Sequence, residues 1–162
     1  MASREAQVMD AAFAAIGAST ATDLVTGATY TKPAGLTAYR TRRSPFGEED
    51  LPAVAMRRVQ EDTTRVAGGH KDRRAFLFGV DCYAVASSDG EAAEDALDVV
   101  RSWVIQAISN VAALQGGTGS LAVSTREVLT KWEESDTNAL YLRATVGFSA
   151  DIITAAGNPD AA

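Results

Sequence analysis

Two segments have apolar residues spaced for an amphipathic helix. The first covers residues 3–16, where Ser3 can cap the amino end and Gly17 can end the helix. Its apolar positions lie among helix-forming residues and are Val8, Ala11, Ala12, Phe13, Ala15 and Ile16. This pattern predicts an amino-terminal amphipathic helix.

The second helix is predicted to begin at Ser88. Ser88 and Glu91 have the spacing at which a serine caps the first turn and a glutamate reaches back to it, and Glu94 and Asp95 add negative charge there. The helix is expected to end near Leu114. Its apolar stripe consists of Ala93, Ala96, Leu97, Val100, Val104, Ala107, Ile108 and Val111.

The remaining apolar runs alternate as strands do. The longest, residues 73–86, is predicted to be a central strand because both of its faces are partly apolar. One face carries Phe76, Phe78, Val80 and Cys82, and the other carries Leu77, Tyr83 and Val85. Shorter strands are predicted at residues 36–41 and 53–60, the second after Pro52, which has no amide hydrogen to donate. Residues 121–132 and 138–148 are predicted to form an antiparallel hairpin.

The segments between these elements predict loops. Residues 18–35 are small and rich in threonine, which predicts an extended loop with at most a short strand at residues 24–26. Residues 40–50 predict a polar, projecting loop. No repeat or domain linker is visible, so we expect one domain over residues 1–154 and a flexible carboxy-terminal tail over residues 155–162.

The net charge of −6 is unevenly distributed. Residues 40–74 hold nine of the fifteen basic residues and six acidic ones, whereas the rest of the chain holds six basic and fifteen acidic residues. This polarity suits a protein that binds copies of itself, or different partners, through complementary faces. Solvated loops with scattered arginines are an alternative that fits the sequence equally well.

Cysteine content and hydropathy give an expectation for the compartment. Cys82 is the only cysteine, so the chain cannot form an internal disulfide, and we expect a reducing compartment. The amino-terminal residues are polar, and no apolar run approaches the roughly 18 residues that span a bilayer. A soluble protein without a signal peptide is therefore expected.

No group of residues has the spacing of a catalytic or metal site. His70 has neither a second histidine nor a nearby cysteine. The glycine-rich residues 116–120 follow a predicted helix, whereas a phosphate-binding loop precedes one, so they are expected to be a connector. The carboxylates at 48–50 and 133–134 lie on predicted loop tips, where water keeps the pKa of an acid ordinary. We predict no catalytic residue, no cofactor and no metal ligand.

Five arginines could contact phosphate groups, so nucleic-acid binding has to be considered. They are Arg40, Arg42, Arg43, Arg57 and Arg58. The acidic total, the lack of interleaved aromatic residues and the lack of helix-turn-helix spacing argue against tight DNA binding.

The order of the elements has a parallel in a known family. A helix and a strand precede a long polar loop, and the next strand enters through Leu51–Pro52–Ala53–Val54 and ends at Glu61–Asp62. A central strand, a long helix and a hairpin that carries Trp132 follow. Over nearly its whole length the chain resembles the tail terminator proteins of long-tailed bacteriophages, the minor tail protein U-like or tail completion proteins.

The resemblance implies an α+β fold: a single domain with a mixed, mainly antiparallel β-sheet, two helices packed on one face and long projecting loops. It also implies a hexameric ring in the virion tail or neck, assembled in the host cytoplasm, that stops growth of the tail tube and joins the head. The implied partners are the tail tube protein, the head–tail connector or neck protein, and genomic DNA that passes through the lumen without specific binding, with no membrane involved. The family has no catalytic residues to carry over.

A structural assembly protein is therefore the first hypothesis. The segment from Arg40 to Asp50 is expected to contact a neighbouring subunit or the tube, through Arg40, Arg42, Arg43, Phe46, Glu48, Glu49 and Asp50. Six copies at −6 each would carry −36, and acidic residues in the channel would let DNA slide past. One alternative is another neck, head-completion or minor tail protein. The other is a small enzyme that binds an anionic substrate through Arg57 or Arg58.

Overall fold

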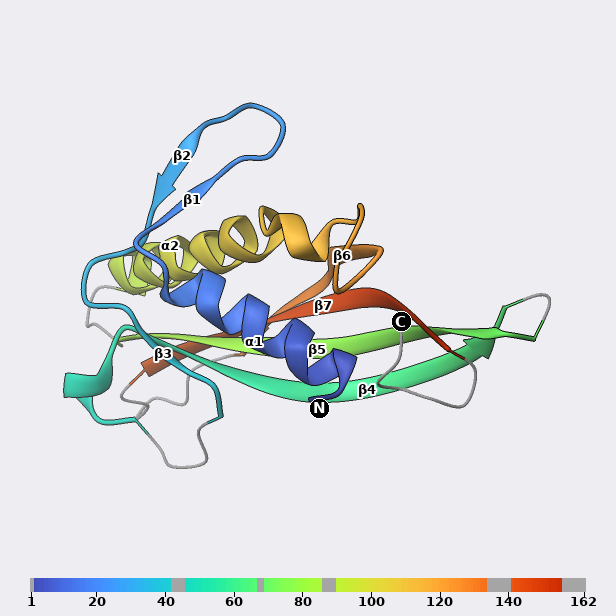
Figure 1. The fold of residues 1–162 in the computed structure, drawn as a ribbon. Helices are drawn as coiled ribbons and strands as arrows, with labels where there is room; N and C mark the ends of the chain where they lie inside the picture. The colour runs from blue at the N-terminus through green and yellow to red at the C-terminus, as the bar shows by residue number, and fades with distance from the viewer. Residues whose placement is uncertain (1, 42–45, 67–68, 86–89, 134–140, 156–162) are drawn as a thin grey trace.

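The central element of the protein is a five-stranded sheet in the order β3-β4-β5-β7-β6 (Figure 1). The computed structural model describes residues 2–41, 46–66, 69–85, 90–133 and 141–155. All neighbouring strands are antiparallel except β3 and β4, so the sheet is mixed and mainly antiparallel. The strands are β3 (Thr37–Tyr39), β4 (Ala53–Arg65), β5 (Lys71–Val85), β6 (Ser124–Glu133) and β7 (Tyr141–Ala155).

Two helices cover one face of this sheet, which confirms the predicted α+β class (Figure 1). They are α1 (Arg4–Gly17) and α2 (Gly90–Ser109). The predicted cap of α1 is present, since the Ser3 hydroxyl accepts from the amide of Ala6 at 3.3 Å. The core lies between the helices and the even-numbered side chains of β5, namely Phe76, Phe78, Val80, Cys82 and Ala84. β5 is therefore the central strand that its pattern predicts.

Trp103 joins the two helices and is absent from the predicted stripe of α2. It is 2% exposed, and its indole Nε1 donates to the backbone carbonyl of Ile16 at 3.1 Å. A buried indole needs an acceptor, and here a different helix supplies it. Ala96 belongs to the predicted stripe but is exposed, because the buried face of α2 is centred on Leu97, Val100 and Val104.

The carboxy-terminal end of α2 also differs from the prediction. The α-helix ends at Ser109, and a short 3-10 helix, η2 (Ala112–Leu114), follows it and buries Leu114. The glycine-rich residues 116–120 then lead from η2 to β6, which confirms that they are a connector. Gly116, Gly117 and Gly119 have positive φ values, which glycine adopts without steric cost.

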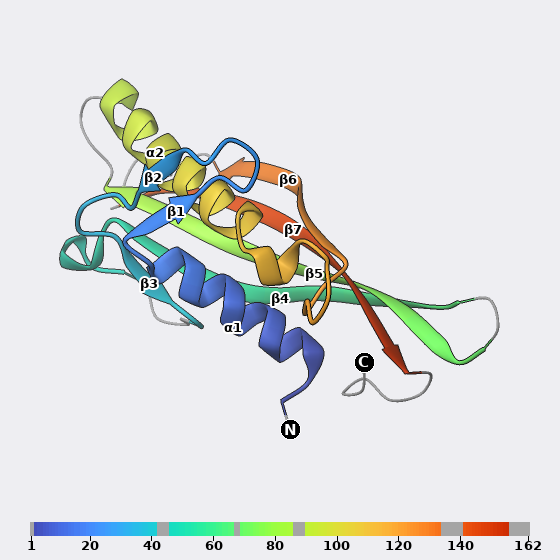
Figure 2. The same ribbon diagram turned by 45° about the horizontal axis from the view of Figure 1, so that its top comes forward.

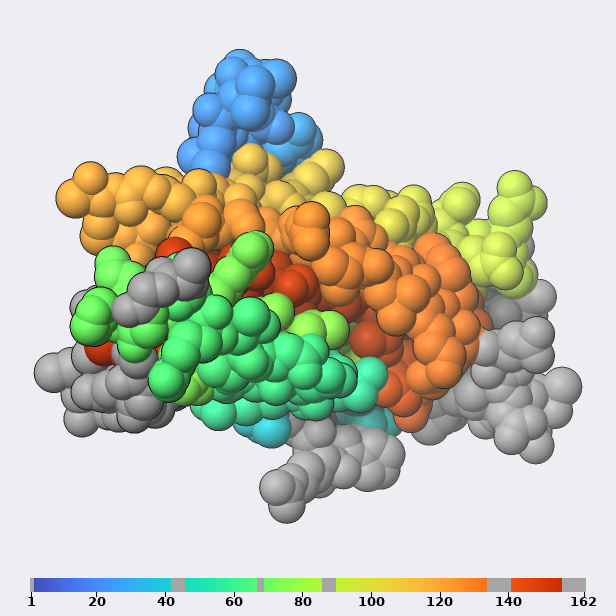
Figure 3. All heavy atoms as spheres, turned by 90° about the vertical axis from the view of Figure 1, so that its right-hand side faces the viewer, coloured from blue at the N-terminus to red at the C-terminus, as the bar shows by residue number. Residues whose placement is uncertain are grey.

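The loop predicted for residues 18–35 is instead a β-hairpin, so that prediction is wrong. β1 (Thr20–Thr22) pairs with β2 (Thr29–Thr31), and the expected strand at 24–26 is the turn between them. The Asp23 carboxylate accepts from the amides of Val25 and Thr26 at 2.8 and 2.7 Å, which fixes this turn. The same two amides lower the pKa of Asp23. Figure 3 shows the hairpin standing clear of the body.

β4 and β5 are longer than predicted and form a second projecting hairpin (Figure 2). The 15 residues of β5 span about 50 Å, whereas the 20 residues of α2 span about 30 Å, so the strands continue past the helices. Arg74 ties the hairpin to the body, since its guanidinium lies 3.8 Å from the Glu5 carboxylate of α1 and also pairs with Glu61. Residues 61–65 and 71–72, which lie between the two predicted strands, therefore also belong to β4 and β5.

β7 is also longer than predicted. It pairs with β5 from Tyr141 to Ala155, whereas the prediction ended it at Phe148. Ala155, the first residue of the predicted tail, is the last residue of this strand. The rest of that tail, residues 156–162, lies outside the described residues.

The position of Trp103 predicts a large effect on stability. Trp103→Ala should lower the free energy of unfolding by about 3–5 kcal/mol, because it removes a fully buried aromatic side chain and leaves a cavity between the helices. Val99→Ala on the exposed side of the same helix is the control and should change it by about 0.5 kcal/mol or less. Urea titration of both variants measures the difference, and equal effects would contradict the packing described.

Candidate functional site

The predicted contact segment, Arg40 to Asp50, lies at the end of the sheet where β3 and β4 pair. Arg40 is half-buried, and its Nε lies 3.0 Å from the Asp10 carboxylate of α1. Phe46 is only 6% exposed and packs on Tyr39 and Tyr83, with ring centroids 5.5 and 4.4 Å away. Arg40 and Phe46 therefore hold the segment against the body.

The acidic part of the segment forms a 3-10 helix, η1 (Glu48–Asp50). The Asp50 carboxylate accepts from the amide of Gly47 at 3.0 Å and from the Tyr39 hydroxyl at 3.3 Å. Glu48 and Glu49 are exposed, so of the predicted contact residues these two are the ones most available to a partner. Arg42 and Arg43, also predicted contacts, lie outside the described residues.

A charged cluster that the sequence did not predict lies on the sheet face opposite the helices. Asp81 of β5 is 6% exposed, and its carboxylate lies 3.3 Å from Arg57 Nε and 3.2 Å from Arg143 Nη2. The Thr145 hydroxyl donates to it at 2.5 Å. Arg143 also pairs with Glu133 of β6 at 3.1 Å. One buried carboxylate thus joins β4, β5 and β7, and Arg143 extends the network to β6 through Glu133.

Strand register brings these residues together. Asp81 lies opposite Ala55 of β4 on one side and opposite Thr145 of β7 on the other. The small residue Gly79 provides the surface on which the Arg57 side chain lies. The sequence signal was a single acid within the largely apolar residues 75–85, but its partners could be named only once the pairing of the strands was known.

The cluster shifts the pKa of two of its neighbouring groups. Burial lowers the pKa of Arg143, but Asp81, Tyr83 and Glu133 together outweigh burial and raise the pKa of this guanidinium. Burial, followed by the charge of Asp81, raises the pKa of the Tyr83 hydroxyl. The arginines are therefore engaged with acids of the same chain, which is the arrangement of a structural cluster.

The arginines proposed for an anionic substrate do not form a cleft. Arg57 lies along the flat sheet face in its pair with Asp81, and Arg58 is exposed on β4. Neither lines the groove of about 890 Å³ beside α2 or the smaller cavity of about 150 Å³ beside η2. This geometry gives no support to the enzyme hypothesis.

Other reactive side chains are also separate from one another. His70 is exposed at the end of the β4–β5 hairpin. Cys82 is fully buried, and burial raises the pKa of its thiol to about 12, so the thiolate that reacts as a nucleophile is not populated at neutral pH. Within the described ranges, no three histidine, cysteine, aspartate or glutamate side chains are grouped so that they could hold a metal ion.

The most exposed surfaces are the two projecting hairpins and the bare sheet face, by which we mean the face opposite the helices outside the area on which Phe46 packs. The β1–β2 turn presents Leu24 and Val25, the latter 94% exposed. Leu129 of β6 is more than half exposed on the bare face, where it lies over Gly147 of β7. Exposed apolar side chains indicate a contact surface when they form a contiguous patch.

Comparisons with known proteins supply no family for this chain. No protein-family model matches it, and no curated protein matches it either. Among the helices that the structure describes, none has the length and apolar content needed to cross a membrane.

The Asp81 cluster predicts a second effect on stability. Asp81→Ala should lower the free energy of unfolding by about 1–3 kcal/mol, because it removes the acceptor of the Thr145 hydroxyl and the ion-pair partner of Arg57, and leaves Arg143 paired with Glu133 alone. Asp62→Ala on exposed β4 should change it by about 0.5 kcal/mol or less. Chemical denaturation distinguishes the two variants, and an Asp81→Ala protein as stable as the wild type would show that the cluster contributes nothing.

Proposed function

We propose that this protein is a structural component of a phage virion, a tail terminator that forms a ring on the end of the tail tube. The observation that carries the proposal is a two-layer core from which two β-hairpins project, with the sheet face opposite the helices covered only in part, where Phe46 packs on Tyr83. Such a molecule presents contact surfaces on several sides of one core. Its function would then depend on how well the contact surfaces of neighbouring subunits match.

The edges of the sheet favour side-chain contacts over strand addition. β4 beyond Ala55 has a strand partner on one side only among the described residues, and β6 likewise pairs with β7 alone. Each of these edge strands has an irregular register, between Arg58 and Gln60 in β4 and between Glu127 and Leu129 in β6. Bulges and charged side chains on edges oppose uncontrolled strand pairing. Defined side-chain contacts, which set a fixed rotation between copies, are the alternative.

In this proposal some residues of the predicted contact segment position η1, and others contact the partner. Arg40, Phe46 and Asp50 position η1 against the body, while Glu48 and Glu49 are offered to the neighbouring subunit or the tube. Arg42 and Arg43 stay predicted contacts. The ring would bind the tail tube protein on one side and the head–tail connector or neck protein on the other, and the genomic DNA would pass through its lumen.

A tube-growth assay tests the proposal. The purified chain is added to the tail tube protein encoded in the same genome while that protein polymerises, and tube lengths are measured by electron microscopy. We expect growth to stop and ring-shaped density to appear at one end of each tube. An unrelated acidic protein of similar size is the control.

Two results would count against the terminator role. Tubes that keep their length distribution at saturating amounts of the chain, with bare ends, would contradict it. Density for this chain in the neck but not on the last tube ring would favour the alternative of a neck or head-completion protein.

A further inference from the structure

The two edge strands β4 and β6 have the same irregularity at the same level of the sheet. In each strand one extra residue interrupts the register, Val59 in β4 and Val128 in β6. The residues that precede these bulges, Arg58 and Glu127, lie in one row across the sheet, because their partners on β5 and β7 are paired with each other. The bulges therefore lie at the two ends of one row, on opposite edges.

Both bulges expose apolar side chains. Val59, Val128 and the adjoining Leu129 are each about half exposed. Among the described residues, β3 pairs only with residues 53–55 of β4, and β6 pairs with β7 alone, so the outer side of both bulges has no strand partner. Such side chains gain free energy when a second surface covers them.

The charges beside the bulges are opposite. Arg58 and Glu127 are exposed, and neither belongs to an ion pair among the described residues. The Glu127 carboxylate accepts from the Thr130 hydroxyl at 2.6 Å. Both charged residues lie on the helix side of the sheet, because they are paired with the buried Phe78 and Phe148. One edge thus offers a base where the other offers an acid.

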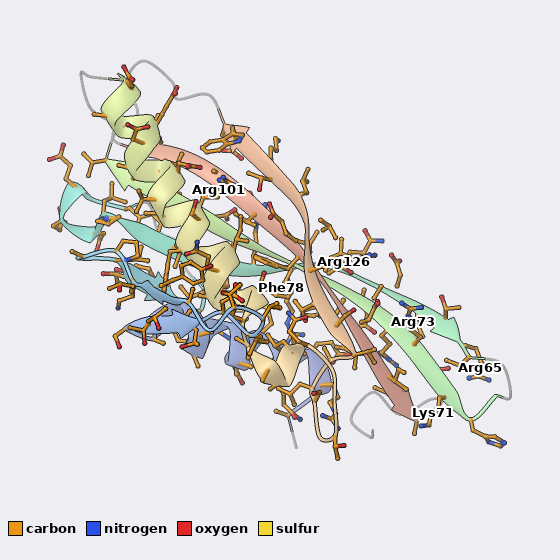
Figure 4. All side chains as sticks on the ribbon, turned by 90° about the horizontal axis from the view of Figure 1, so that it is seen from above. Arg65, Lys71, Arg73, Phe78, Arg101 and Arg126 are labelled. Carbon is orange, nitrogen blue, oxygen red and sulfur yellow. The ribbon has the colours of Figure 1, made fainter. Side chains whose placement is uncertain are left out.

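A second complementary pair lies on the other side of the same edges. Arg126 of β6 is exposed midway along the sheet (Figure 4) and shares a row with Gln60 of β4. The Gln60 amide donates to the exposed Asp62 carboxylate at 2.9 Å. From the hairpin end inward, β4 therefore presents the acid Asp62 and then the base Arg58, whereas β6 presents the base Arg126 and then the acid Glu127.

These two edges cannot meet within one chain. β5 and β7 lie between β4 and β6. Three strand spacings of about 4.8 Å separate the backbones of the two edges by roughly 14 Å. A second copy, in contrast, can place its β6 edge against the β4 edge of the first.

We infer that the β4 edge of one copy binds the β6 edge of a second copy, with the two bulges at the centre of the contact. The contact is heterologous, because two different edges meet, and repetition with a fixed rotation closes a ring. The bulges interrupt a continuous backbone ladder, so side chains set the fit. Charge complementarity selects which edges meet and in which orientation. The inference rests on the proposed ring and names its subunit contact.

Charge reversal on each edge tests the contact. The variants are Arg58→Glu on β4 and Glu127→Arg on β6. Both residues are exposed and outside the ion pairs of the described residues, so each variant should keep the wild-type circular dichroism and thermal midpoint. Each variant should weaken self-association in sedimentation velocity by about tenfold or more, because two like charges then face each other between copies.

Combining the two changes in one chain gives the decisive result. Arg58→Glu with Glu127→Arg restores opposite charges at every contact between copies, so the double variant should recover most of the wild-type association. Because the two residues lie on opposite edges of one chain, such recovery has to come from a contact between copies. Glu94→Arg, which reverses an exposed acid on α2, is the matched control and should not weaken association.

The outcomes separate this contact from the ring itself. If the wild type assembles and both single variants assemble equally well, the edge contact is wrong while the ring proposal stands. If the single variants are weakened but the double variant does not recover, Arg58 and Glu127 do not meet, and the inferred contact is again wrong. A wild-type chain that stays monomeric at every concentration, alone and with tube protein, contradicts both the contact and the ring.

Discussion

The packing of two helices on the even-numbered face of β5 is the constraint on which the structure depends. Phe76, Phe78 and Val80 are buried there, and both helices and the neighbouring strands β4 and β7 pack around them. Burial of this size is the main favourable term in the folding of a small domain. Because the helices cover one face and only part of the length of the strands, the ends of the hairpins and the part of the other face that the segment of Phe46 does not cover stay exposed.

Charge is distributed around this core in two ways. On the bare sheet face, Asp81 engages Arg57 and Arg143, so the charges there are largely satisfied within the chain. Towards the ends of the molecule many charges are paired too, as in Arg65–Asp72 and Arg73–Asp151, while Glu94 and Lys71 are exposed and belong to no ion pair among the described residues. Exposed charges of this kind steer association with other molecules, and this steering weakens as salt rises.

The sequence predicted the elements whose apolar residues recur at a regular spacing. The central strand, both helices and the antiparallel pairing of β6 with β7 were predicted because their apolar residues repeat every two or every three to four positions. The β1–β2 hairpin was missed because its strands are three residues long and depend on the Asp23 turn. Trp103 was missed because its burial requires an acceptor on α1. The Asp81 cluster and the groove depend on which strands are neighbours, and a single sequence does not contain that information.

The proposed role leads to one central expectation, which is that the chain binds copies of itself. Light scattering on the purified wild-type chain tests this most directly. The chain has a mass of 17.0 kDa, so a closed hexamer has six times that mass, about 102 kDa. The account predicts that one discrete species of ring mass accumulates as concentration rises, and that added salt reduces it. A mass that stays at 17.0 kDa over the whole concentration range would contradict the account.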